Sequence, residues 1–141
     1  LPLPYPNASF HHVISLGVFQ MLPDLTDLFG DVSRILKDLG AFAFTYGEHK
    51  PGANDGFKSI RDDDVGKGVE PDTEMTIYRH SENYVMNLLF DNGFTVWKVQ
   101  EFVANVHPKT GTKYYQTAVI AQKRGDRVER TDVIDELFEA K

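Results

Sequence analysis

Three side chains that can exchange a proton or form strong hydrogen bonds end or follow the apolar segment at residues 41–46 (AFAFTY). Tyr46 ends this segment, and Glu48 and His49 come directly after it. Histidine is the side chain that most often serves as a general base, so His49 is a candidate catalytic group, with Tyr46 as a second candidate. The alternative is that Tyr46 belongs to the hydrophobic core and that Glu48 and His49 lie in a solvated loop.

Two groups of potential metal ligands lack the geometry that a metal site requires. His11 and His12 are consecutive, and consecutive side chains of a strand point to opposite faces, so they cannot bind one ion together. The acidic segment at residues 62–74 lacks the spacing and the tight glycine turn of a calcium loop, which favours a solvated loop. The chain has no cysteine, which excludes disulfides, thiolate ligands and a cysteine nucleophile. The sequence therefore predicts no metal site.

The composition of the chain is that of one ordinary domain. Its 141 residues are 41% hydrophobic and 26% charged, and no apolar run approaches the roughly 18 residues of a membrane span. The start of the chain has no signal-peptide pattern, so we expect a cytoplasmic protein without a membrane partner. The net charge of −6, without a clustered basic surface, argues against nucleic acid as a partner. The chain begins with Leu-Pro-Leu-Pro rather than methionine, and we expect it to derive from a longer or processed protein.

The elements that would position these side chains begin with a βαβ unit. The apolar run at residues 10–19 predicts a strand buried on both faces, and residues 41–46 predict a second strand. Between them, apolar residues recur at helical spacing over residues 25–39, with Asp24 as the expected N-cap and Gly40 as the expected C′ residue. A strand, a helix and a strand joined by short connections require two parallel strands.

An irregular segment and a second helix follow. Residues 47–79 are polar and rich in Gly, Asp and Pro, which is typical of a long irregular loop. Ser81 is the expected N-cap of a helix that ends at Asn92-Gly93. The apolar stripe of this helix would consist of Tyr84, Val85, Leu88 and Leu89.

The C-terminal part predicts an antiparallel hairpin and a short helix. Strands at residues 94–106 and 113–122 are joined by a connection too short for a crossover helix, so they should pair antiparallel. Residues 131–140 predict a short acidic amphipathic helix. The expected fold class is therefore α/β, with two parallel strands plus a C-terminal antiparallel hairpin and helices packed on the sheet.

These segments resemble the C-terminal half of class I S-adenosylmethionine-dependent methyltransferases, of the type 11-like group. Residues 3–24 resemble the segment around the family's fourth strand, and residues 32–40 resemble the helix and turn before its fifth strand. Asn92-Gly93-Phe94 resembles the Ala-Gly-Phe turn into the sixth strand. The resemblance covers residues 1–123, which would form a partial Rossmann-like half-domain, and residues 124–141 would be a C-terminal extension.

The resemblance implies S-adenosylmethionine as the cofactor and a small molecule as the methyl acceptor. Ligands of open α/β sheets bind beyond the carboxyl ends of the strands. The residues implied for cofactor contact are Ser15, Leu16, Gly17, Val18 and Phe19. The residues implied for substrate contact are Tyr46, Glu48, His49, Tyr78 and Arg79. An N-cap role of Ser81 would explain the segment at residues 78–81 equally well.

The family's Gly-rich turn and the acidic residue that holds the cofactor ribose would precede Leu1, and the chain has no Gly-x-Gly-x-x-Gly pattern. Each missing hydrogen bond weakens binding by about 1–3 kcal/mol, so this chain alone should neither bind the cofactor tightly nor be catalytic. The alternative is a non-enzymatic oligomerisation or binding module from a truncated methyltransferase gene. Without the N-terminal half, the strand at residues 13–18 would be an exposed apolar edge, which predicts a homodimer or a partner chain.

Overall fold

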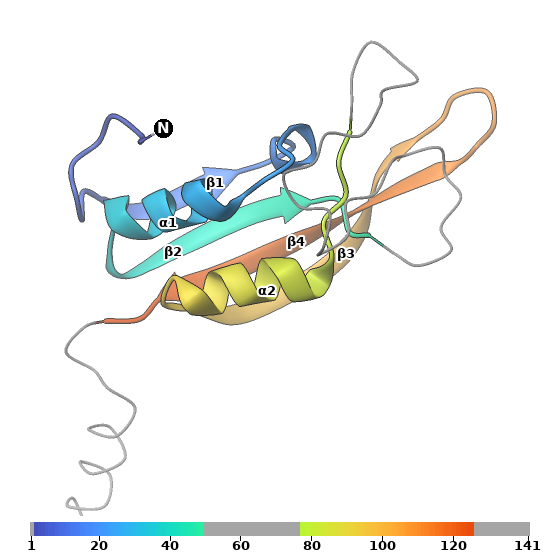
Figure 1. Cartoon of the computed structure of the whole chain (residues 1–141). Helices are drawn as coiled ribbons and strands as arrows, with labels where there is room; N and C mark the ends of the chain where they lie inside the picture. Colours follow the sequence, from blue (N-terminus) through green and yellow to red (C-terminus); the bar gives the residue numbers. More distant parts are fainter. Residues whose placement is uncertain (1, 50–76, 126–141) are drawn as a thin grey trace, which may run out of the picture.

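The computed structural model describes residues 2–49 and 77–125, which form a four-stranded sheet with two helices on one face (Figure 1). The strands are β1 (Phe10–Ser15), β2 (Leu36–Tyr46), β3 (Phe94–Val106) and β4 (Lys113–Lys123). The helical elements are η1 (Phe19–Met21, a 3-10 turn), α1 (Thr26–Ile35) and α2 (Glu82–Asp91). Within these two ranges, no helix is long and apolar enough to cross a membrane. The predicted helix at residues 131–140 and the acidic segment at residues 62–74 lie outside the described residues.

The pairing of the strands confirms the expected fold class. The strand order is β1-β2-β4-β3, with β1 parallel to β2 and β4 antiparallel to both of its neighbours. The connection between β3 and β4 is short, which forces these two strands to run in opposite directions. The hairpin is added at the edge of β2, and its second strand, β4, is the one that pairs with β2.

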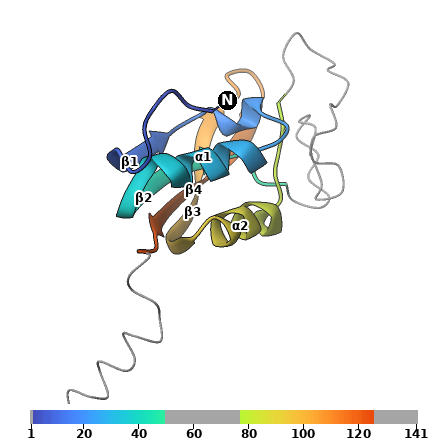
Figure 2. The ribbon, with the colours of Figure 1, turned by 60° about the vertical axis from the view of Figure 1, so that its left-hand side comes forward.

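The hydrophobic core lies between the sheet and the two helices (Figure 2). Alternate residues of β2 point toward the helices, and Phe42, Phe44 and Tyr46 are at most 1% exposed. Phe19 from η1 and Phe29 from α1 lie beside Phe44, with ring centroids 5.3 and 5.2 Å away. Each aromatic pair of this kind adds about 0.5–1.5 kcal/mol beyond the burial of the rings. The core therefore fixes η1, which follows β1, against the end of β2.

Helix α1 is shorter than the sequence predicts, because it ends at Ile35 instead of Leu39. Leu36 has an extended backbone (φ −78°, ψ 139°) and pairs with Phe10 of β1. Leu36 and Leu39 keep the helical spacing, but Leu36 pairs with β1 and Leu39 lies in the irregular stretch between the paired residues Leu36 and Ala41, with a φ of +64°. Pairing with β1 thus overrides the local helical preference of these residues.

The two predicted caps of α1 also act differently from the prediction. Asp24 lies one residue before the observed cap position, although its Oδ1 still accepts a hydrogen bond from the Thr26 N–H at 2.9 Å. Gly40 does not end the helix, since it lies within β2. A Cβ atom at Gly40 would lie 2.8 Å from the carbonyl oxygen of Lys37 and 2.9 Å from that of His11. Glycine is needed there for the close approach of β1 and β2.

Strand β1 is shorter than the predicted strand at residues 10–19, and the prediction that it is buried on both faces is wrong. The strand stops at Ser15, and the chain turns at Gly17, whose φ is +70°. Ile14 is 67% exposed. The reason is that β1 is an edge strand and that no described element covers the sheet face opposite α1 and α2.

The predictions for α2 and for the hairpin are confirmed. The Ser81 Oγ accepts a hydrogen bond from the Tyr84 N–H at 3.1 Å, as expected of an N-cap. Val85 and Leu89 are fully buried against the sheet. Gly93 follows the helix with a φ of +83°, a conformation that favours glycine. The ends of β3 and β4 agree with the predicted strands to within one residue.

Candidate functional site

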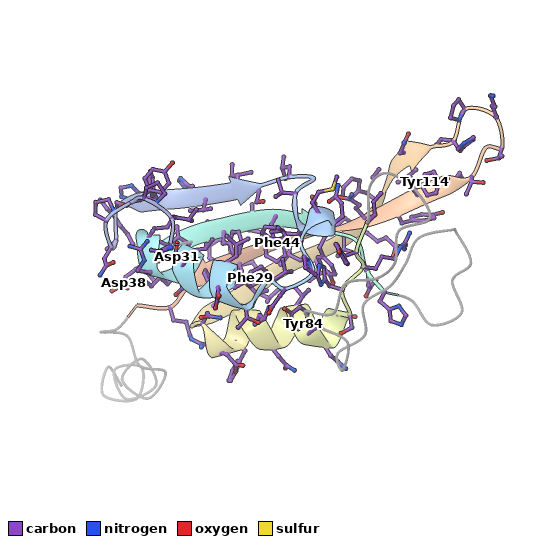
Figure 3. The ribbon with its side chains drawn as sticks, turned by 45° about the horizontal axis from the view of Figure 1, so that its top comes forward. Phe29, Asp31, Asp38, Phe44, Tyr84 and Tyr114 are labelled. Carbon is purple, nitrogen blue, oxygen red and sulfur yellow. The ribbon has the colours of Figure 1, made fainter. Side chains whose placement is uncertain are left out.

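The parallel strands β1 and β2 end at the same edge of the sheet, which is where ligands bind in open α/β folds. In Figure 3, Tyr114 lies at this end of the molecule, whereas Asp31 and Asp38 lie at the opposite end. The turn after β1 is tied to β2 because the Gly17 N–H donates a hydrogen bond to the Thr45 Oγ1 at 2.9 Å. The segment that follows β1 and the segment that follows β2 therefore begin next to each other.

The segment after β2 is held against the segment before α2. The His80 N–H donates to the carbonyl oxygen of Gly47, and the His49 N–H donates to that of His80, both at 2.8 Å. The Tyr78 N–H donates to the carbonyl oxygen of Gln20 at 2.7 Å, which joins η1 to the same group. Backbone hydrogen bonds thus bring together three segments that are distant in the sequence.

These segments and the hairpin line an open cavity of about 360 Å³. Its wall includes Gln20 from η1, the residues Tyr78 and Arg79 before α2, and the residues Tyr114 and Tyr115 of β4. The volume lies near the lower end of the range of about 300–1,000 Å³ that is typical of small-molecule sites. Aromatic rings combined with a few polar groups are also typical of such sites.

Arg79 is a buried cation in this wall. Its side chain is 7% exposed, and its Nη1–H donates to the carbonyl oxygen of Glu48 at 3.3 Å. The guanidinium of arginine carries several hydrogen-bond donors, so Arg79 adds donor groups to the wall of the cavity.

His80 is a fully buried histidine at the centre of this arrangement. Its Nε2 lies 3.1 Å from the carbonyl oxygen of Phe19, and its ring lies 5.6 Å from that of Tyr84. Burial lowers the pKa of His80, against the opposing effect of backbone hydrogen bonds with Phe19 and Leu22 and of the charge of Asp24. The ring is therefore neutral at pH 7, with the Nε2–H donating to Phe19. Its Nδ1 makes no hydrogen bond to any residue that the structure describes.

Two of the predicted substrate residues line the cavity, and three do not. Tyr78 and Arg79 are in its wall. Glu48 and His49 belong to the adjacent backbone ladder with His80, outside the lining. Tyr46 lies in the hydrophobic core, which was the alternative left open by the sequence. Burial raises the pKa of the Tyr46 hydroxyl well above its usual value, and the carboxylates of Glu48 and Glu82 add to this, so Tyr46 remains protonated at neutral pH.

The segment predicted for cofactor contact divides into an exposed part and a buried part. Leu16 and Val18 are 64% and 46% exposed at the end of β1. Phe19 is 1% exposed and belongs to the aromatic core, so its ring is not available to a ligand. The roles of Ser15 and Gly17 remain predictions.

The sequence does not single out His80, Tyr114 or Tyr115 as site residues. His80 lies directly before the N-cap Ser81, and a histidine at the entry of a helix was the only signal available for it. Tyr46, the last residue of β2, pairs with Thr117 of β4, so Tyr114 and Tyr115 lie just beyond the end of β2, next to the site. The sequence alone does not predict this register. In the ranges 2–49 and 77–125, no three His, Asp or Glu side chains form a group that could hold a metal ion.

Comparisons with known proteins agree with the geometry. The sequence model of a methyltransferase-domain family matches residues 1–44. None of the curated proteins matches the chain. A solved S-adenosylmethionine-dependent methyltransferase from Methanosarcina mazei is 19% identical, with a TM-score of 0.64 over 86% of this chain and 63% of that one. A second such enzyme, from Mesorhizobium loti, is 17% identical, with a TM-score of 0.57 over 86% of this chain and 65% of that one.

A third solved structure contains bound ligands. It is the 1,6-didemethyltoxoflavin-N1-methyltransferase from Burkholderia thailandensis, with 1,6-didemethyltoxoflavin and S-adenosylhomocysteine. It is 18% identical, with a TM-score of 0.55 over 84% of this chain and 46% of that one.

The chain has a class I S-adenosylmethionine-dependent methyltransferase-like fold. Its four strands form part of the Rossmann-like sheet of such proteins, as expected from the resemblance. The chain spans less than two thirds of the length of each of the three solved structures. Identities this low establish the fold and leave the reaction to be argued from the site.

S-adenosylmethionine, the cofactor that the resemblance implies, needs both an apolar contact surface and donors for its polar ends. Leu16 and Val18 form an exposed apolar surface at the end of β1. The one complete strand-to-helix connection that the structure describes, residues 16–25, contains a single glycine, and the N–H of this Gly17 is already bonded to Thr45. The described part of the chain therefore lacks a Gly-rich turn that could hold the rest of the cofactor.

Proposed function

We propose that this chain contributes the acceptor side of an S-adenosylmethionine-dependent methyltransferase site. The observation that carries the proposal is the cavity beside the carboxyl ends of β1 and β2, with Tyr78 and Arg79 in its wall. The exposed Leu16 and Val18 at the end of β1 would face the methyl donor. In the Burkholderia thailandensis relative a small molecule and S-adenosylhomocysteine are bound together, which supports a small-molecule acceptor here.

The isolated chain should not catalyse the transfer. One apolar surface cannot replace the hydrogen bonds that hold the polar ends of the cofactor, each of which contributes about 1–3 kcal/mol. The rest of the cofactor site must come from residues outside the described ranges or from another chain. The cytoplasmic location expected from the sequence is part of this proposal.

Calorimetric titration of the 141-residue chain with S-adenosylmethionine and S-adenosylhomocysteine tests the proposal. We expect no saturable heat in the micromolar range, because only one side of the cofactor is contacted. The oligomeric state in the same buffer shows whether a second copy is present. Saturable micromolar binding by a monomer would contradict the proposal, since the chain would then hold the complete cofactor site itself.

A second candidate function is a non-enzymatic oligomerisation or binding module. It is favoured by the position of β1 at the edge of the sheet, where its unpaired backbone side and the exposed side chain of Ile14 are both available for pairing. A homodimer or a partner chain would then associate through residues 13–18. The two functions are compatible, because strand pairing at β1 could also supply the other side of the cofactor site.

A further inference from the structure

A second hollow of the described chain lies between α2 and the edge strand β3. Its volume is about 420 Å³, and Met86 and Phe90 of α2 and Val96 of β3 are part of its wall. Phe90 is 68% exposed, and Met86 and Val96 are only partly buried against the core. This hollow, which we call the α2–β3 groove, shares no residue with the cavity beside Tyr78, so it is a separate apolar surface.

The apolar surface of the groove continues along β3. Val99 pairs with Val119 of β4, whose side chain is 1% exposed in the core. Directly paired residues of neighbouring strands lie on the same face of the sheet, so Val99 is on the face that α2 covers. It is nevertheless 43% exposed. Within residues 2–49 and 77–125, α2 thus leaves the β3 edge of this face uncovered.

The end of the described chain is held at this groove. Arg124 belongs to its wall, and the Arg124 N–H donates to the carbonyl oxygen of Gly93 at 2.8 Å. The Arg124 Nη2–H donates to the carbonyl oxygen of Phe90 at 3.1 Å, and the Cζ lies 5.2 Å from the centroid of the Phe90 ring. In Figure 1 the chain leaves β4 next to the C-terminal end of α2. The segment after Gly125 therefore begins beside the groove.

This segment, residues 126–141, lies outside the described residues, and its sequence has the pattern that such a groove requires. The predicted helix at residues 131–140 has an apolar stripe, which consists of Val133, Ile134, Leu137 and Phe138. A helix of about ten residues is marginal in water by itself, so its stripe needs a surface to pack against.

The lengths of the segments are compatible with docking in the same chain. Residues 126–130 reach at most about 17 Å when extended, and a ten-residue helix is about 15 Å long. The strand from Phe94 to Val99 spans about 17 Å, so the helix can lie beside it. A segment on a short linker meets its surface at a millimolar effective concentration, which favours it over a second copy at micromolar concentration.

We propose that the predicted helix at residues 131–140 docks its apolar stripe into the α2–β3 groove of the same chain and covers Val99. The C-terminal extension then adds a helix beside α2 on this face of the sheet. An amphipathic helix and an uncovered apolar strip of a sheet each bury their apolar side in this way. The proposal concerns a surface apart from the methyltransferase-like site and does not depend on the proposed function.

Methyl chemical shifts of the complete chain, with 13C-labelled Met, Ile and Val methyl groups, test the docking. Leu137→Ser removes an apolar side chain from the stripe and weakens the helix. Compared with the wild-type chain, this variant should shift the methyl signals of Met86, Val96 and Val99. The wild-type signals of these residues should stay in place on dilution, because the contact is within one chain.

A matched variant and two reference residues provide the control. Glu139 lies about 200° around the predicted helix from Leu137, so Glu139→Ser changes the same helix on its polar side and should leave all these signals in place. Ile14 and Ile120 both pair with Ala43, on the sheet face opposite the helices, and their signals should not move in either variant. Unchanged signals of Ile14 and Ile120 also show that the sheet remains folded.

Three results would overturn the proposal. Leu137→Ser without effect on Met86, Val96 and Val99 would mean that the segment does not dock in the groove. Shifts at Ile14 and Ile120 instead would mean that it covers the opposite face. Wild-type signals that move on dilution toward those of Leu137→Ser would place the segment in the groove of a second copy. None of these results affects the calorimetric test of the cofactor side.

Discussion

His80 is enclosed between η1 and α2, and its exposed fraction is 0%. The ring joins the two segments through the hydrogen bond to Phe19 and the contact with Tyr84. A protonated imidazole in this position would lose its hydration and face few charges of opposite sign apart from Asp24. The side chain therefore connects the geometry of the site with the stability of the fold.

The pH dependence of stability should report the burial of His80. Its folded-state pKa lies below the ordinary value of 6.5, so between these two values the unfolded chain binds more protons than the folded chain. The free energy of unfolding should therefore decrease as the pH falls below 6.5, and it should level off below the lowered pKa. Urea denaturation at a series of pH values measures this, in a range above the titration of Asp24, whose pKa is lowered from 3.8 by hydrogen bonds with Thr26.

A pair of variants assigns this pH dependence to one residue. His80→Gln removes the titrating ring and should flatten the decrease below pH 6.5. His12→Gln changes an exposed histidine of β1 and should leave the decrease in place. An unchanged pH dependence in His80→Gln would show that the buried ring does not control it.

The sequence predicts the ends of a helix correctly where residues next to those ends determine them. Helix α2 begins at a serine cap and ends at a glycine with positive φ, and both signals are local. The end of α1 is set instead by pairing of Leu36 with β1, which involves residues 26 positions apart in the chain (Phe10 and Leu36). The spacing of apolar residues along the sequence does not show whether a residue at the end of a helix continues the helix or pairs with a strand.

The same distinction explains which site residues were predicted. Tyr78 and Arg79 follow from the resemblance and from their place before α2. Tyr114 joins the site only through the register of β4 against β2. This register depends on tertiary packing, which spacing in one sequence does not specify.

Two glycine substitutions should change stability in opposite directions. Gly40→Ala places a Cβ within 3 Å of two backbone oxygens between β1 and β2, and the overpacking should destabilise the chain by about 1–3 kcal/mol. Gly30→Ala lies inside α1, where its nearest contact is an ordinary 3.5 Å to the Asn92 side chain. Its higher helix propensity should stabilise the chain by about 0.5–1 kcal/mol. Urea midpoints of the two variants that move in the same direction would contradict this account of Gly40.

On the scale of the whole molecule, the two helices cover one face of the sheet, and β1 forms one of its edges (Figures 1 and 2). The described residues provide no cover for the opposite face or for this edge. Exposed apolar edges favour pairing with another chain. Two side chains with nearly equal exposure allow a matched test, since Ile14 of β1 is 67% exposed and Phe90 of α2 is 68% exposed.

If the β1 edge mediates self-association, Ile14→Lys should shift the chain from dimer to monomer, because a charged side chain at an edge strand opposes pairing. Phe90→Lys removes an equally exposed apolar side chain from a different surface and should leave the dimer intact. Sedimentation velocity at several concentrations measures both. A monomeric wild-type chain, or equal dissociation in the two variants, would exclude an interface at β1.

We propose that the carboxyl end of β1 is one side of a methyltransferase-like cofactor site. Amide chemical shifts of the 15N-labelled chain during titration with S-adenosylhomocysteine up to millimolar concentration test it most directly. We predict progressive, unsaturated shifts at residues 15–18 and none at Asn87 on the far side of α2, since only one side of the cofactor is contacted. Shifts that avoid residues 15–18, or that saturate in the micromolar range, would contradict the account.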